Sequence, residues 1–225
     1  MTKTESGLNS PNERLLEPEF EGVYGRYKVT LADQKEVQFY RISVLICGVA
    51  FCGGISQWLI LGPTYAWIWL VLMAISLGLA LQWIHIYLRP LHNALKVLWA
   101  LGCLGFLFIG LHEGTAMMLS IISKKPIWTL IVGPFFAALT GLGFKEFFCF
   151  QRIEAIGLTL LVPIALIGHL SGVLNQSIVI ISLGFASVLL IMLAIRKFGM
   201  DLAADIGDKS VFEYLKNQKA ASTAS

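Results

Sequence analysis

Hydrophobic residues gather along this chain into six long runs that contain almost no charge. Each run is close to the length of about 20 residues that a helix needs to cross the hydrocarbon core of a bilayer. The runs are separated by short polar or glycine- and proline-containing segments, which favour turns. We therefore predict an all-α fold, a polytopic transmembrane helical bundle of six spans, at roughly residues 42–61, 65–88, 94–111, 127–144, 155–171 and 177–195.

The fourth and fifth runs each contain a proline in an otherwise helical pattern. Gly133-Pro134 lies within the fourth run, and Pro163 lies in the middle of the fifth. Because proline lacks the backbone N–H that a helix uses, we expect both helices to be broken there. Transporters often build their substrate sites from such interrupted helices.

Small residues recur at helical spacing within the spans. Gly133, Ala137 and Gly141 follow one another every four residues in the fourth run, and similar series occur in the other runs. Small residues on one face let helices approach closely in lipid. These faces predict tight packing within the bundle or contact with other membrane proteins through glycine-rich helix faces.

Polar segments flank the spans and divide the chain into three parts. We predict a polar tail with an interfacial segment at residues 1–41, the membrane domain at 42–195, and a second polar tail with a short amphipathic helix at 196–225. Thr30 with Asp33 and Ser210 with Glu213 have the spacing of helix capping boxes. The aromatic segment at 20–30 forms either a short extended piece or a chain lying on the headgroups. The apolar segment around Met117–Ile122 is too short to span and is expected to be interfacial or re-entrant.

Composition and charge agree with lipid as the solvent. Hydrophobic residues make up 56% of the 225 residues and charged residues only 14%, against about a quarter in soluble domains. A net charge of +3 is too small to indicate nucleic-acid binding.

Basic residues are more frequent in the loops on the side of the two tails, which places both tails on the cytoplasmic side. With seven spans instead, the C-terminal basic cluster would lie outside. Six spans leave only Lys124 and Lys125 on the outer side, against Arg26, Lys28, Lys35, Arg41, Arg89, Lys96, Lys145, Arg152, Arg196 and Lys197 on the inner side.

The chain contains no recognisable catalytic motif. HExxH, GxSxG, the P-loop and the dinucleotide-binding fingerprint are all missing from the sequence. The four cysteines form no CxxC pair, which argues against a disulfide framework or a thiolate zinc site. We expect no cofactor. The cysteines are interpreted as packing residues: Cys47, Cys52, Cys103 and Cys149.

Two groups of polar residues are candidate sites. The predicted topology places His112, Glu113 and His169 together at the outer ends of spans three and five. Two imidazoles and a carboxylate suit a divalent metal or a proton relay, although adjacent helical residues point about 100° apart. The alternative is that they bond to water, headgroups or a carbonyl.

The second group lies at the inner ends of the spans. Its opposite charges predict ion pairs that anchor a loop, or else a site where a substrate or proton enters. It comprises Gln82, His85, Arg89, Lys145, Glu146 and Glu154.

Four segments resemble a known family. These are Tyr24-Gly-Arg-Tyr27, His112-Glu-Gly114, Gly133-Pro134 through Glu146, and Gly168-His169-Leu170. They resemble the integral membrane proteins called domain of unknown function 2301, over about residues 20–200. The resemblance implies a multi-pass protein without an established activity, in a plasma or thylakoid membrane of cyanobacterial or plastid type.

Three functions fit these observations. The first is an integral membrane protein that transports or senses a small solute or ion, which the two proline-containing spans indicate. The alternative is a non-catalytic scaffold or assembly factor for a larger membrane complex, favoured by the lack of ionisable residues at mid-depth. A membrane enzyme that uses the outer histidines is the third.

Overall fold

The computed structural model describes residues 18–86, 89–211, 214 and 217, and every structural statement below concerns these residues. The chain divides into two compact units. One is the membrane bundle, residues 39–199, and the other joins the described parts of residues 1–38 and 200–225. Each unit is described by itself.

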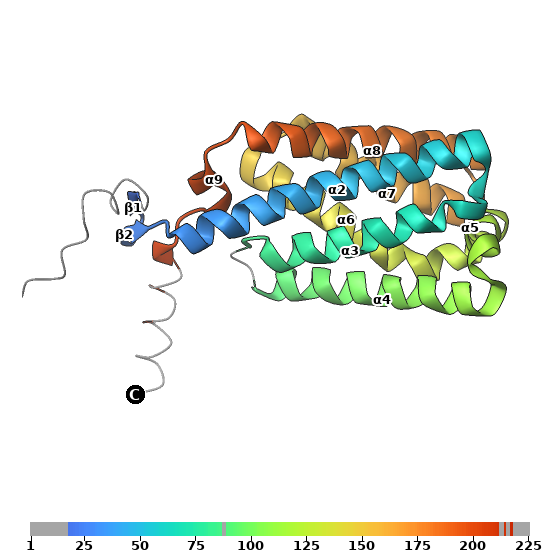
Figure 1. Ribbon diagram of the computed structural model, residues 1–225, viewed down its shortest axis with the longest axis horizontal. Coiled ribbons are helices and arrows are strands. Elements are labelled where there is room, and N and C mark those ends of the chain that lie inside the picture. The colour runs from blue at the N-terminus through green and yellow to red at the C-terminus, as the bar shows by residue number, and fades with distance from the viewer. Residues whose placement is uncertain (1–17, 87–88, 212–213, 215–216, 218–225) are drawn as a thin grey trace, which may run out of the picture. The chain divides into compact units, whose positions relative to one another are not determined.

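Long apolar helices form the bundle (Figure 1). Six helical segments in the described part of the chain are long and apolar enough to cross a membrane, which confirms the predicted fold class. Short 3₁₀ turns, η1 (Pro63–Tyr65) and η2 (Pro126–Trp128), lead into two of the helices. The helices are α2 (Leu31–Leu61), α3 (Trp67–Trp83), α4 (Arg89–Glu113), α5 (Thr115–Lys124), α6 (Thr129–Phe150), α7 (Ile153–Leu170) and α8 (Gln176–Phe198).

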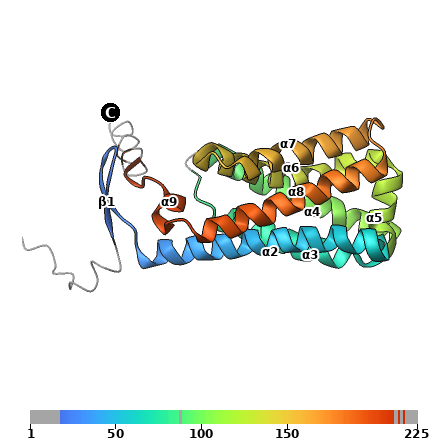
Figure 2. The ribbon, with the colours of Figure 1, turned by 90° about the horizontal axis from the view of Figure 1, so that it is seen from above.

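Helix α6 is central to the packing of the bundle. It packs against α4 on one side and α7 on the other, and α7 packs in turn against α8 (Figure 2). The side chains of Phe135, Leu139 and Leu142 on α6 are fully buried. Lipid-facing positions of the same helix, such as Leu130, stay apolar and exposed. The bundle therefore buries one stripe of each helix and leaves the rest for hydrocarbon.

Glycines set how closely these helices approach. A Cβ added at Gly102 of α4 would overlap the backbone nitrogen of Phe135, and one at Gly105 would come within 2.5 Å of the Ile131 carbonyl oxygen. On α6, a Cβ at Gly141 would overlap the side chain of Leu95. Several small-residue faces are thus occupied by helices of the same chain.

The predicted breaks at the two prolines are wrong. Helix α6 continues through Pro134 to Phe150, and α7 continues through Pro163. A proline costs a helix one backbone hydrogen bond, whereas unwinding a span would leave several polar backbone groups facing hydrocarbon. A continuous helix therefore loses fewer backbone hydrogen bonds than a broken one.

Two predicted span ends also change. Helix α3 ends at Trp83, and Arg89 opens α4, with Pro90 in the first turn where its missing N–H costs little. Residues 87 and 88, assigned to the second span, lie outside the described residues. The fourth predicted span ends at residue 144, whereas α6 continues to Phe150. Gln151 then turns the chain in a left-handed conformation, and α7 begins at Ile153.

Helix α5 lies across one end of the bundle. It contacts α4, α3 and both 3₁₀ turns, and it buries Met118. Its length of 10 residues confirms a non-spanning helix at the predicted place. Whether it is interfacial or re-entrant stays a prediction.

The smaller unit contains a β-hairpin. Strands β1 (Glu19–Gly22) and β2 (Gly25–Lys28) pair antiparallel, so the extended alternative for this segment is the one observed. The capping box is confirmed, because the Thr30 amide donates to the Asp33 carboxylate at 2.8 Å and the Asp33 amide donates to the Thr30 hydroxyl at 3.2 Å. Buried Val29, Val37 and Ile206 of α9 (Leu202–Ile206) form its core. Glu213, of the second predicted box, lies outside the described residues.

Candidate functional site

A fully buried carboxylate lies near the C-terminal end of α6. Glu146 has no exposed surface and receives three donors. The Tyr40 hydroxyl of α2 donates to Oε1 at 2.5 Å, and the Lys145 ammonium donates to the same oxygen at 3.0 Å. The Lys197 ammonium of α8 donates to Oε2 at 2.6 Å. One side chain thus joins three helices through charged hydrogen bonds, which are the strong kind.

Aromatic rings complete the surroundings of the two ammonium groups. Lys145 Nζ lies 5.3 Å from the Tyr40 ring centroid and 5.2 Å from that of Phe150. Lys197 Nζ lies 5.2 Å and 4.6 Å from the same two rings. The negative ring faces stabilise cations that have lost their water. We call Tyr40, Lys145, Glu146, Phe150 and Lys197 the Glu146 cluster.

Local helix geometry explains how neighbouring residues reach one site. Lys145 and Glu146 leave α6 about 100° apart, so only a long, flexible side chain can turn back to its neighbour. Lysine has that reach. Phe150 lies one turn beyond Glu146 and covers both ammonium groups.

A second ion pair, of which only the carboxylate is buried, lies beside the cluster. Glu154, in the first turn of α7, pairs with Arg196 of α8, the residue before Lys197. The Glu154 side chain is 2% exposed and its Oε2 atom has no partner, while the Arg196 side chain is 52% exposed. This pair ties α7 to α8 at the same end of the bundle.

The residues of the predicted inner group do not form one site: some belong to the Glu146 cluster or the Glu154–Arg196 pair, and others make separate contacts. Lys145 and Glu146 come together, whereas Gln82 accepts a hydrogen bond from Lys96 at 3.0 Å. Helix α3 ends before His85 and Arg89, and Arg89 instead begins α4. Tyr40 and Lys197 were not predicted as site residues. Tyr40 lies just before the first apolar run and Lys197 just after the sixth, both at the predicted inner side, and this position could have indicated them.

The predicted outer group is also divided. His169 is buried, and its Nε2 lies 3.2 Å from the carbonyl oxygen of Ile122, which joins α7 to α5. His112 Nδ1 lies 3.4 Å from Glu113 Oε1, on a more exposed surface. Within the described chain these three residues form no group close enough to hold one metal ion. The structure therefore separates His169 from the other two.

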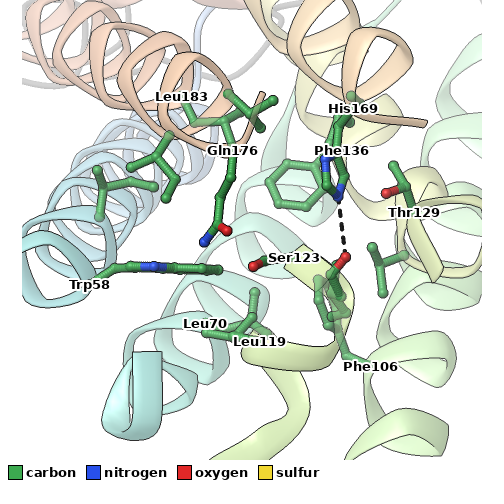
Figure 3. A pocket seen from close by; sticks show the side chains of 16 residues that line it. Trp58, Leu70, Phe106, Leu119, Ser123, Thr129, Phe136, His169, Gln176 and Leu183 are labelled. Carbon is green, nitrogen blue, oxygen red and sulfur yellow. Dashed lines mark hydrogen bonds between the residues drawn. The ribbon is translucent and has the colours of Figure 1, made fainter. Parts of the chain in front are cut away.

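His169 instead borders a cavity of about 100 Å³ beneath α5 (Figure 3). The walls come from α2, α3, α4, α5, α6, α7 and α8, and they are mainly aliphatic and aromatic. Neither His112 nor Glu113 lines it.

Comparison with known families agrees with this architecture. The model of the family described as Uncharacterized integral membrane protein (DUF2301) matches residues 79–214, more than half of the chain. The chain belongs to the DUF2301 family. No curated protein and no solved structure matches it. The DUF2301 match includes Lys145, Glu146, His169 and Lys197 but begins after Tyr40. The DUF2301 region thus contains all the charged groups of the Glu146 cluster.

Proposed function

We propose that this protein transports or senses a small solute or ion, and that Glu146 is its proton-carrying group. The observation that carries the proposal is a carboxylate with no exposed surface, bonded to two ammonium groups within the ends of membrane-crossing helices. Ionisable groups in such places are costly and commonly mark ion or substrate pathways.

Stability alone gives a poor reason for such a cluster. The desolvation cost of a buried ion pair often equals or exceeds the attraction between its charges, so apolar residues would hold the same helices together as well. A cluster that joins α2, α6 and α8 has another use. Protonation of Glu146 would weaken its bonds to both ammonium groups and thereby loosen the contact between three helices.

The scaffold alternative has less support from the packing. Glycines contact helices of the same chain at Gly102, Gly105 and Gly141, whereas a Cβ at Gly133 would meet nothing within 4 Å and Ala137 of the same α6 face is exposed. A partner would have to bind this open part of the α6 face or another surface. The scaffold role is therefore kept as an outcome of the test below.

The test is proton movement in proteoliposomes that contain the purified protein and a trapped pH-sensitive dye. A potassium diffusion potential drives protons inward, and the rate of internal acidification is compared with that of protein-free liposomes. The proposal expects a faster rate with the protein. No difference in rate, together with copurification at a fixed ratio with a larger membrane complex, would favour the scaffold.

We also propose the membrane and the orientation. The resemblance noted from the sequence supports a plasma or thylakoid membrane of cyanobacterial type, and the distribution of basic residues supports cytoplasmic tails. Fractionation of native membranes followed by immunodetection tests the first proposal.

A further inference from the structure

The cavity beneath α5 combines apolar walls with a few polar groups at defined places. Phe106, Val132 and Phe136 supply much of its apolar wall. The side chains of Trp58, Ser123 and Gln176 converge on one side of it in Figure 3. Gln176 is exposed, so the cavity borders the end of the bundle rather than its middle.

One buried polar group at this cavity has no partner. The residue Thr129 is 4% exposed, and its Oγ1 atom makes no hydrogen bond. Threonines inside helices can bond back to their own backbone, as Thr140 of the same helix does with the carbonyl oxygen of Phe136 at 2.9 Å. In Figure 3 the Thr129 hydroxyl points toward the side of the cavity where His169 lies. A buried hydroxyl without a partner costs free energy, so its retention calls for an explanation.

We propose that this cavity binds a small uncharged molecule with an apolar body and one hydroxyl or carbonyl group, which bonds to Thr129. Among the described residues that line the cavity, His169 has the one titratable side chain, and a charged ligand would lose its water without gaining a counter-ion. An apolar cavity of about 150 Å³ holds benzene, so this one suits a somewhat smaller molecule. The inference rests on the proposed function in one respect, since the bound molecule would be the solute that is transported or sensed.

The test uses trifluoroethanol as the probe and trifluoropropane as its counterpart without a hydroxyl. Fluorine NMR of the protein in lipid nanodiscs measures saturable binding of each probe, with empty nanodiscs as the baseline. Thr129→Val removes the hydroxyl and keeps the shape of the side chain. Thr140→Val is the matched control, since it makes the same change on the same helix away from this cavity.

We expect Thr129→Val to weaken trifluoroethanol binding about tenfold, the usual effect of one lost hydrogen bond in a binding site, and to leave trifluoropropane binding unchanged. Thr140→Val should bind both probes as the original protein does. Absence of saturable trifluoroethanol binding, or equal trifluoroethanol affinity in the Thr129→Val and original proteins, would overturn the inference. Because binding is measured without any gradient, a protein that binds the alcohol but moves no protons contradicts only the proposed function.

Discussion

At the scale of single residues, Glu146 should be the most sensitive position in the bundle. Glu146→Gln keeps the shape of the side chain but removes the buried carboxylate that pairs with the ammonium groups of Lys145 and Lys197. Breaking one partner of a buried pair costs about 3–5 kcal/mol, and we expect a loss of that size in the free energy of unfolding. Unfolding by sodium dodecyl sulfate in mixed micelles measures it.

Tyr40→Phe is the matched control for this change. It removes one hydrogen bond to Glu146 and keeps every charge, so the expected loss is about 1 kcal/mol. Equal losses for the two variants would show that the charges of the cluster contribute nothing beyond one hydrogen bond.

The hydrogen bonds of Asp208 in the smaller unit should depend on pH. Hydrogen bonds from the Ser210 hydroxyl and the Val23 amide hold the pKa of Asp208 below its ordinary value of 3.8. The contact is therefore complete above the ordinary pKa and is lost as the pH falls through the lowered pKa. The amide shift of Val23 in NMR should titrate with a midpoint below 3.8, and Asp208→Asn should abolish that titration. A midpoint at or above the ordinary value would contradict the contact.

At the scale of elements, the approach of α4 to α6 depends on Gly102. Gly102→Ala would place a methyl group against the backbone of Phe135, and overpacking of this kind costs about 1–3 kcal/mol. Gly110→Ala on the same helix would meet nothing closer than 3.6 Å, and should be neutral or stabilising by up to about 1 kcal/mol. Unfolding in mixed micelles compares the two. A similar effect at both positions would mean that α4 and α6 do not approach as described.

The elements also show what the sequence allows one to predict. Apolar runs located all six spans, since lipid demands long apolar helices whatever their partners. Helix ends were harder, because burial by other helices decides them. Lys145 and Glu146 look like the end of a span in the sequence, yet α6 continues to Phe150 since Tyr40 and Lys197 supply their partners.

The candidate site was predictable only in part, for the same reason. Lys145 and Glu146 are adjacent in sequence and attract attention together. Lys197 is 51 residues from Glu146, and only the packing of α6, α7 and α8 brings it there. No local pattern shows that Thr129 lacks a partner, since this depends on what surrounds its hydroxyl.

At the scale of the whole molecule, the orientation in the membrane can be tested with single cysteines. Basic residues favour an inner position for Lys35 and an outer one for Lys124. In a Cys149→Ser background, a membrane-impermeant thiol reagent applied to intact cells should label Lys124→Cys and not Lys35→Cys. The reverse pattern would invert the topology, and labelling of both without permeabilisation would contradict an odd number of crossings between them.

The central claim is that a buried carboxylate carries protons, and proton flux through its variants tests it most directly. In proteoliposomes under a potassium diffusion potential, Glu146→Gln should reduce protein-dependent acidification at least tenfold, since the amide cannot exchange a proton. Glu113→Gln makes the same change at the other end of the bundle and should leave the rate unchanged, with reconstituted amounts matched for folded protein. Equal rates for Glu146→Gln and the original protein would contradict the claim.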